Sequence, residues 1–251
     1  MPDEDRHLDR RRAQAASFGA VAAAYERGRP PYPSEAIDWL LPAGATRVLD
    51  LGAGTGKLTR QLRDRGLRVV AVEPSAQMRE QLASVVPGVP VHAGSAEDIP
   101  LGDGSVDAVL VAQAWHWVDP GRAVPEVARV LVPGGQLGLA WNLRDERADW
   151  VASLGRILHD PGETGGSRTH GITSPPFGAV QRLTVGWAHR VTRDALLDLV
   201  SSRSYVITMP AAQRAVVLAE VSRLADTHPA LAGHDEFTLP YVTECFRAQL
   251  A

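Results

Sequence analysis

Three glycine residues in five positions mark the place where this chain can bring its backbone closest to a ligand. Gly52, Gly54 and Gly56 belong to the segment DLGAGTGKL, which follows an apolar run and precedes a helix-like stretch. Because glycine has no Cβ atom, the main chain can approach a bound molecule closely there. About twenty residues later Glu73 ends a second apolar run, where nucleoside-binding α/β proteins place an acid that accepts hydrogen bonds from both ribose hydroxyls. The pattern predicts a nucleoside-containing ligand.

The spacing of the glycines separates three classes of ligand. A P-loop reads G-x-x-x-x-G-K-[ST], but here Leu51 stands in the place of its first glycine and Leu58 follows the Gly-Lys pair. A nucleoside triphosphate is therefore excluded. A dinucleotide fold prefers G-x-G-x-x-G, whereas this loop reads G-x-G-x-G with Lys57 in the last glycine position. The spacing disfavours a nicotinamide dinucleotide but leaves it as an alternative. It favours a ligand that has no phosphate.

The elements that must position these residues alternate between strand and helix up to about residue 142. Apolar runs predict strands, and apolar residues one helical turn apart predict the helices between them. Gly66 and Ser75 are suited to end the first helix and to begin the second. The predicted order is strand 47–51, helix 57–65, strand 68–74, a helix after Ser75, strand 106–114, helix 124–131, a turn at 133–135 and strand 136–142.

After residue 142 the alternation is looser. The pattern predicts a helix at 149–158, a long loop at 160–178, a strand near 183–191, helices near 193–201 and 211–225, and a last strand near 237–246. The whole predicts a doubly wound, Rossmann-like α/β fold with a mostly parallel seven-stranded sheet, helices on both faces and an antiparallel C-terminal strand. We expect residues 1–33 to form an N-terminal tail with a candidate lid helix. Residues 34–251 then form one domain, with a cofactor half at 34–142 and substrate-side elements at 143–251.

Composition limits the partners and the location. The 251 residues carry a formal net charge of −3, with both signs interspersed, which argues against a nucleic-acid surface. We find no apolar run long enough to span a membrane and no signal-peptide pattern, so a cytoplasmic protein is expected. Cys245 is the only cysteine, which excludes an internal disulfide and a zinc site built on several thiolates. The sequence leaves the oligomeric state open.

Four motifs occur in an order that resembles one enzyme family. VLDLGAGTGKL, VVAVEPSAQM, GSAEDIPLGDGSVDAVLVAQAWHW and LVPGGQLGLAWN extend from about Arg47 to Asn142. Together they are similar to the motifs of the class I S-adenosylmethionine-dependent methyltransferases. FGAVAAAYERGRPPYP, QAWHW, SRSYVI and LPYVTECFRA further resemble a small-molecule subgroup that includes the trans-aconitate-like carboxyl-methylating enzymes.

This resemblance implies S-adenosyl-L-methionine as cofactor, S-adenosyl-L-homocysteine as its product, and a role for each matching residue. The backbone at Ala96 and the side chain of Glu97 or Asp98 would read the polar edge of adenine, while Asp50 would fix the glycine loop more than touch the ligand. Met78 suits the core of a helix face as well as it suits packing on adenine. The implied cofactor-binding residues are Asp50, Gly52, Ala53, Gly54, Glu73, Pro74, Met78, Ala96, Glu97, Gln113, Tyr25 and Arg29.

The resemblance also implies in-line methyl transfer to a small acceptor, without a metal, favouring a carboxylate or hydroxyl oxygen. A hydroxyl or amine profits from a general base, and His116 is the best-placed candidate, although it could equally orient or pack between two tryptophans. Arg203 is a candidate for substrate binding, but it could instead offset the macrodipole of a helix that ends near it. An NAD(P)-dependent oxidoreductase and a non-catalytic adenosylmethionine-binding protein remain as alternatives. The candidate substrate-binding residues are Tyr32, Trp115, Trp117, Asn142, Arg144 and Arg203.

Overall fold

Five parallel strands form the part of the sheet that carries the glycine loop. In the computed structural model, β1 (Arg47–Leu51) pairs in parallel with β2 (Arg68–Val72) on one side and with β4 (Val106–Ala112) on the other. The two-residue strand β3 (Val91–His92) pairs with β2, and β5 (Leu131–Arg144) pairs with β4. The structure describes residues 29–158, 168–169, 171–172 and 175–251.

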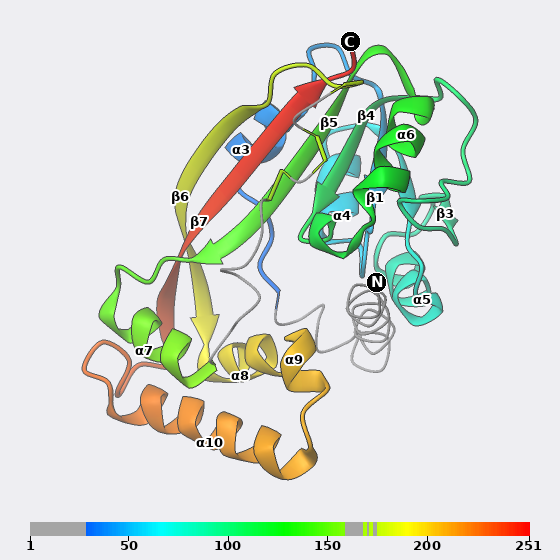
Figure 1. Ribbon diagram of the computed structural model, residues 1–251. Coiled ribbons are helices and arrows are strands. Elements are labelled where there is room, and N and C mark those ends of the chain that lie inside the picture. Colours follow the sequence, from blue (N-terminus) through cyan, green and yellow to red (C-terminus); the bar gives the residue numbers. More distant parts are fainter. Residues whose placement is uncertain (1–28, 159–167, 170, 173–174) are drawn as a thin grey trace. The chain divides into compact units, whose positions relative to one another are not determined.

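Two C-terminal strands complete a seven-stranded sheet of order β3-β2-β1-β4-β5-β7-β6 (Figure 1). β7 (Glu236–Gln249) lies between β5 and β6 (Gln181–Thr192). Backbone hydrogen bonds join Asp145 N–H to the Pro240 carbonyl and Leu250 N–H to the Gly135 carbonyl, so β7 runs antiparallel to β5. The sequence-based prediction of a mostly parallel, doubly wound sheet with an antiparallel C-terminal strand is confirmed.

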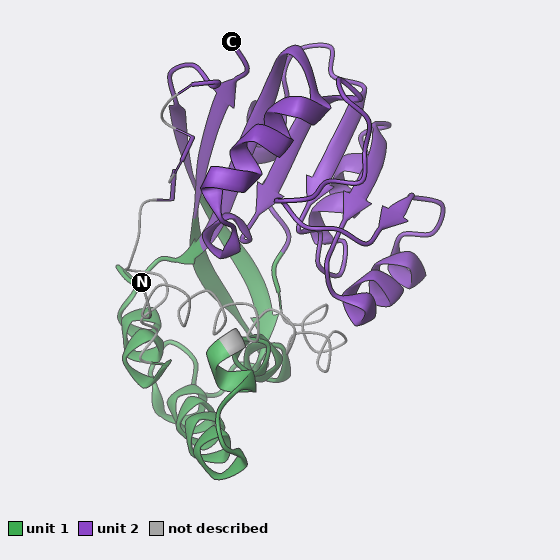
Figure 2. Ribbon diagram, turned by 45° about the vertical axis from the view of Figure 1, so that its right-hand side comes forward, with its two compact units in different colours: residues 1–30, 143–165, 186–242 green, residues 31–142, 166–185, 243–251 purple. Residues whose placement is uncertain are grey.

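The chain divides into two compact units (Figure 2). Among described residues, unit 2 comprises 31–142, 168–169, 171–172, 175–185 and 243–251, and unit 1 comprises 29–30, 143–158 and 186–242. The unit changes after Asn142, the residue at which we place the end of the cofactor half, and the described residues 168–169, 171–172, 175–185 and 243–251 group with the glycine loop.

Four helices of unit 2 pack on its parallel strands, with α6 in front of the strands in the view of Figure 1. They are α3 (Ser34–Leu40), α4 (Lys57–Arg63), α5 (Ala76–Val85) and α6 (Pro120–Val130). Apolar side chains of α3 and α4 share a buried cluster with residues of β1, β2 and β4. Ser75 caps α5 as expected, accepting a hydrogen bond from Met78 N–H, and the Asp119 side chain caps α6.

Unit 1 has its own core. Its helices are α7 (Asp149–Leu158), α8 (Arg193–Ser201), α9 (Ser204–Ile207) and α10 (Ala211–Thr227). Their apolar faces form a buried cluster that includes Trp150 packed edge-to-face on Phe237, with ring centroids 5.5 Å apart. None of the helices in the described residues is both long and apolar enough to cross a bilayer.

The structure differs from the expected elements in several places. The predicted turn at 133–135 is instead part of β5, with Gly134 at a φ of +74° and a register shift beside it. α6 begins earlier than predicted because Asp119 and Pro120 supply an N-cap and a first-turn proline. α3, β3 and α9 are elements that the sequence reading did not include.

Candidate active site

The glycine loop connects β1 to α4 in a conformation that needs glycine for steric reasons. Gly52 has a φ of +71°, and a Cβ atom there would lie 2.8 Å from the Cβ of Ala114. Gly56 has a φ of +91°, and a Cβ atom there would lie 2.9 Å from Cγ of Leu82. The missing side chains therefore let the loop close against the carboxyl end of β4 and against α5.

Glu73 lies beside this loop at the end of β2 and is 7% exposed. Its two carboxylate oxygens accept hydrogen bonds of 2.9 Å each, from Gly54 N–H and from Ser75 N–H. The Arg79 guanidinium donates to the carbonyls of Glu73 and Pro74, at 2.9 and 2.7 Å, and so holds the strand end. Burial raises the pKa of Glu73, although the two backbone N–H groups oppose the rise. Each oxygen keeps a lone pair, so the carboxylate can still accept from two vicinal hydroxyls.

Asp50 forms the floor beneath the loop and is 1% exposed. Its Oδ2 accepts a hydrogen bond of 2.6 Å from the hydroxyl of Thr59, in the first turn of α4. Burial raises the pKa of Asp50 to about 7, and the negative charge of Glu73 raises it further, while the bonds from Thr59 lower it. Two buried carboxylates therefore flank the glycine loop. Such a lining repels phosphate and favours ribose hydroxyls or a cationic group.

Gln113, directly after β4, is a non-glycine residue with a φ of +59°. Its side-chain amide donates to the carbonyl of Asn142 at 2.9 Å, and its own N–H donates to the carbonyl of Ala140. A positive φ in such a residue is strained and is often found at functional sites. The strained residue adjoins Ala114, which the glycine loop approaches at Gly52.

Asn142 has a structural hydrogen-bond network. Its amide nitrogen donates to the carbonyl of Pro31 at 3.0 Å, and its amide oxygen accepts from the hydroxyl of Thr243 at 2.6 Å. Tyr32 next to Pro31 is buried in the core of unit 2, with both of its backbone polar groups bonded to the Gln61 amide. The chain from Pro31 onward thus belongs to the folded unit, and Asn142 positions this segment.

The aromatic segment after β4 forms a short 3₁₀ helix, η2 (Trp115–Trp117). Trp115 is buried, whereas the ring of His116 is exposed and lies 4.7 Å from the ring of Trp117. His116 lies beyond the carboxyl end of β4, and its role as a base stays a prediction.

The remaining residues expected around adenine also lie in unit 2. Ala53, Met78 and Ala96 are buried, so Met78 is a core residue of α5 whatever else it contacts. Glu97 is half-buried and accepts a hydrogen bond of 2.8 Å from the N–H of Asp119. Two other expected residues, Pro74 and Asp98, are exposed.

Three expected arginines belong to unit 1. Arg144, at the end of β5, is 6% exposed, and Arg203, after α8, is 7% exposed. Arg29 is half-buried and its guanidinium lies 3.4 Å from the carbonyl of Ser202. Tyr25 lies outside the described residues, as does most of the expected lid.

Three contributors to the site were missed by sequence reasoning. Thr59 and Arg79 hold the two buried carboxylate positions, and Ala114 gives the loop its close contact. The position of Thr59 on the inner face of the helix after the glycine loop is a sequence signal that could have identified it. Cys245 is a buried core residue, and burial raises the pKa of its thiol to about 12.

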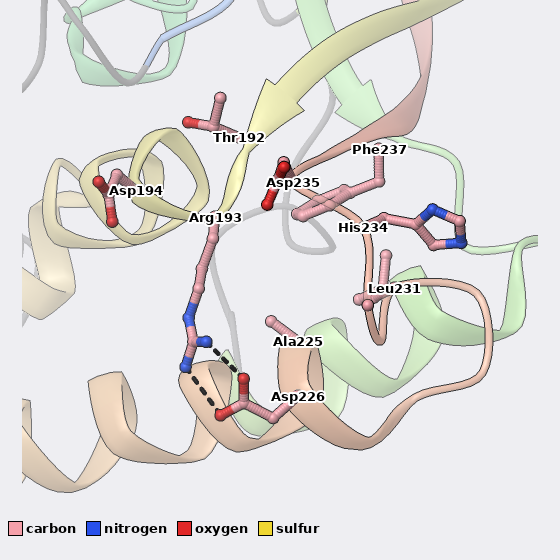
Figure 3. Close-up of a pocket in the computed structure, with 10 residues that line it drawn as sticks. Thr192, Arg193, Asp194, Ala225, Asp226, Leu231, His234, Asp235 and Phe237 are labelled. Atoms are coloured by element: carbon pink, nitrogen blue, oxygen red, sulfur yellow. Dashed lines mark hydrogen bonds and ion pairs between the residues drawn. The ribbon is translucent and has the colours of Figure 1, made fainter.

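A separate hollow of about 400 Å³ lies in unit 1 and contains none of the expected residues (Figure 3). Arg193 and Asp226 form a two-pronged ion pair on its wall, and the lining also includes the apolar side chains of Leu231 and Phe237. Both charged side chains are about half exposed, so the pair contributes roughly 0.2–1 kcal/mol. In the part of the chain that the structure describes, no group of His, Cys, Asp and Glu side chains is arranged to hold a metal.

Comparisons with known proteins agree on one family. The model of a methyltransferase domain matches residues 49–139, from β1 through most of β5. An uncharacterized methyltransferase of Mycobacterium tuberculosis is 59% identical over 96% of this chain and 98% of its own length. An uncharacterized methyltransferase-like protein of Schizosaccharomyces pombe is 33% identical over 93% of this chain and 95% of its own length.

Solved structures show the same architecture. A methyltransferase from Anaeromyxobacter dehalogenans aligns with a TM-score of 0.66 and 28% identity, covering 88% of this chain and 97% of that one. An S-adenosylmethionine-dependent methyltransferase from Thermotoga maritima aligns with a TM-score of 0.52 and 22% identity, covering 94% and 99% of the two chains.

Proposed function

Since this chain belongs to the class I S-adenosylmethionine-dependent methyltransferases, we propose that it binds this cofactor at the glycine loop of unit 2 and methylates an oxygen of a small anionic acceptor. The observation that carries the proposal is the buried Glu73 carboxylate, held by Gly54 N–H and Ser75 N–H at the edge of a loop flanked by a second carboxylate. The Gly54 N–H of the loop thus donates to an acid, and Gly52 and Ala53 N–H donate to the Val72 carbonyl, an arrangement that suits ribose hydroxyls and a cation better than a pyrophosphate.

The protein's own groups bind and orient. Glu73 would accept from the two ribose hydroxyls, and its negative charge would favour the cationic end of the cofactor, joined by the charge of Asp50 above about pH 7. The backbone at Gly52 would lie near the methionyl portion, next to Gln113. When bound, the cofactor supplies an electrophilic methyl group, which reacts by in-line displacement.

We expect calorimetric titration to detect S-adenosylhomocysteine binding, and saturating ligand to raise the melting temperature, because a ligand that binds only the native state stabilises it. NAD serves as the matched comparison, since it shares the adenosine but adds a pyrophosphate. Stabilisation by NAD, with no effect of S-adenosylhomocysteine, would mean that the cofactor assignment is wrong.

The acceptor class is proposed from the chemistry of two side chains. Arg144 and Arg203 are both nearly buried, and a buried arginine is almost always paired with an acceptor group. The planar guanidinium group matches a carboxylate in a bidentate geometry. A methyl-transfer assay over small carboxylic acids, phenols and amines would identify the acceptor class, and turnover only of amines would contradict the proposal. Absence of turnover with every acceptor would favour a binding protein.

The variant His116→Ala tests whether a base takes part. A carboxylate is already ionised at neutral pH, so we expect turnover to fall by less than ~10-fold and the loss to remain at high pH. The measurement is a pH–rate profile on the acceptor found in the screen. His234→Ala, which removes an exposed histidine of unit 1, is the control (Figure 3).

The opposite result has a clear signature. A loss of ~10²-fold or more that recovers as pH rises would show that His116 removes a proton from a hydroxyl or amine. The carboxylate proposal would then be abandoned, while the cofactor assignment would stand.

A further inference from the structure

A polar network joins three segments of unit 2 at Asn142, near the carboxyl end of β5. Asn142 lies two residues beyond Ala140, the last residue of β5 that pairs with β4, so the ladder with β4 no longer holds its backbone. The residue is 5% exposed, and its amide oxygen, amide nitrogen and backbone carbonyl each take part in a hydrogen bond. Each of these bonds leads to a different segment.

The two ends of the Asn142 amide hold β7 and the start of unit 2. The amide oxygen accepts from the Thr243 hydroxyl at 2.6 Å, and the amide nitrogen donates to the Pro31 carbonyl at 3.0 Å. Next to Pro31, both backbone polar groups of Tyr32 are bonded to the Gln61 amide, at 2.9 and 2.7 Å. Because the Thr243 hydroxyl donates to the amide oxygen, it orients the Asn142 amide so that its nitrogen faces Pro31.

The third bond leads towards the glycine loop. The backbone carbonyl of Asn142 accepts from the side-chain amide of Gln113 at 2.9 Å. Gln113 has a φ of +59°, a strained conformation that persists only where the surrounding structure holds it. Ala114 follows directly, and a Cβ atom at Gly52 would lie 2.8 Å from the Cβ of Ala114. A shift of the Asn142 backbone can therefore reach the loop through Gln113 and Ala114, because packing this close transmits displacement.

We infer that Asn142 is a positioning residue of the cofactor site. The inference rests on the proposed function, and it gives Asn142 a role other than the substrate contact that the sequence suggested. The side chain, oriented by Thr243 and fastened to Pro31, holds the carbonyl that fixes Gln113 beside the glycine loop. Thr243 is fully buried, so no ligand touches it, yet the affinity for the cofactor depends on its hydroxyl group.

The experiment measures the Kd of S-adenosylhomocysteine by calorimetric titration of the full chain. Thr243→Val removes the hydroxyl group but keeps the size of the side chain, and the Kd should rise about 5- to 10-fold, as for the loss of one hydrogen bond. Thr243→Ser keeps a hydroxyl group, so its Kd should stay within about 2-fold of the wild-type value. Asn142→Ala removes both side-chain bonds and should raise the Kd about 10-fold or more.

A double-mutant cycle separates positioning from a general loss of stability. In the Asn142→Ala background, Thr243→Val should raise the Kd by less than about 2-fold, because the amide on which the hydroxyl acts is gone. Gln136→Leu is the matched control. The Gln136 amide is also buried on β5 and donates to the Leu40 carbonyl at 2.6 Å, so its loss should lower the melting temperature without changing the Kd.

Three results would overturn the inference. They are a Kd of Thr243→Val within about 2-fold of the wild-type value, an undiminished effect of Thr243→Val in the Asn142→Ala background, and an equal loss of affinity in Gln136→Leu. If Asn142→Ala does not fold, Asn142→Leu, which keeps most of the volume, takes its place in the cycle. Failure of the wild type to bind S-adenosylhomocysteine would instead refute the proposed function.

Discussion

Replacing Glu73 by alanine should weaken the binding of S-adenosylhomocysteine by about 2–4 kcal/mol, or roughly 30- to 1,000-fold in Kd. The variant removes a buried carboxylate that would accept from two ribose hydroxyls, and each such charge-assisted bond is stronger than a neutral one. It also removes the acceptor of Gly54 N–H, so the glycine loop loses its link to β2. The measurement is the Kd by calorimetric titration, with the melting temperature of the unliganded variant as the check on folding.

Two companion variants separate charge from shape. Glu73→Gln keeps the size and one acceptor oxygen, so its loss of affinity should lie between those of the wild type and the alanine variant. Glu80→Ala removes an exposed carboxylate from α5 and should leave the Kd unchanged. A Kd of Glu73→Ala within about threefold of the wild-type value would show that Glu73 does not bind the ribose.

The parallel half of the sheet could be predicted because its signals are local. β1, β2 and β4 are short apolar runs, and the glycine and serine residues that punctuate the helices act through their own backbone conformation. The segment at 133–135 shows the limit of this reasoning. Proline and two glycines read as a turn, but the segment is a bulge within β5: Leu131 pairs with Val106 and Gln136 with Ala108, so the residues between them have no partners on β4.

In the candidate site, too, the residues with local sequence signals were predicted and those that act through long-range contacts were not. The glycine loop and Glu73 were found from spacing alone, since β1 and β2 bring residues about twenty positions apart side by side. Thr59 carries no signal until α4 is placed on the sheet, where it faces Asp50. Thr243 is further removed, because its partner Asn142 lies 101 residues away along the chain. Long-range polar contacts of this kind have no periodicity that a single sequence displays.

Burial of Asp50 should make the protein less stable as pH rises. The pKa of Asp50 in the folded protein is about 7, against 3.8 for the unperturbed carboxyl group, and the main cause is desolvation. Below about pH 4 the group is protonated in both the folded and unfolded states. Between the two values the native state binds the proton more tightly, so its contribution to stability is progressively lost as pH rises to about 7. Glu73, whose pKa is also raised, adds like-charge repulsion once both groups ionise.

The variant Asp50→Asn should therefore gain stability relative to the wild type at alkaline pH. Its neutral amide oxygen can accept a hydrogen bond from the Thr59 hydroxyl, as the carboxyl group of Asp50 does, but the amide is never charged. Between pH 5 and the folded-state pKa of about 7, the wild type loses about 1.36 kcal/mol of unfolding free energy for each pH unit. The difference in unfolding free energy between the variant and the wild type should therefore grow by roughly 3 kcal/mol from pH 5 to pH 8. Guanidinium denaturation at several pH values measures this difference directly. Asp235→Asn makes the same chemical change at an exposed position of unit 1 and should show a flat difference (Figure 3). An equally flat difference for Asp50→Asn would show that Asp50 is ionised throughout this range, and that the negative charge beneath the glycine loop is permanent.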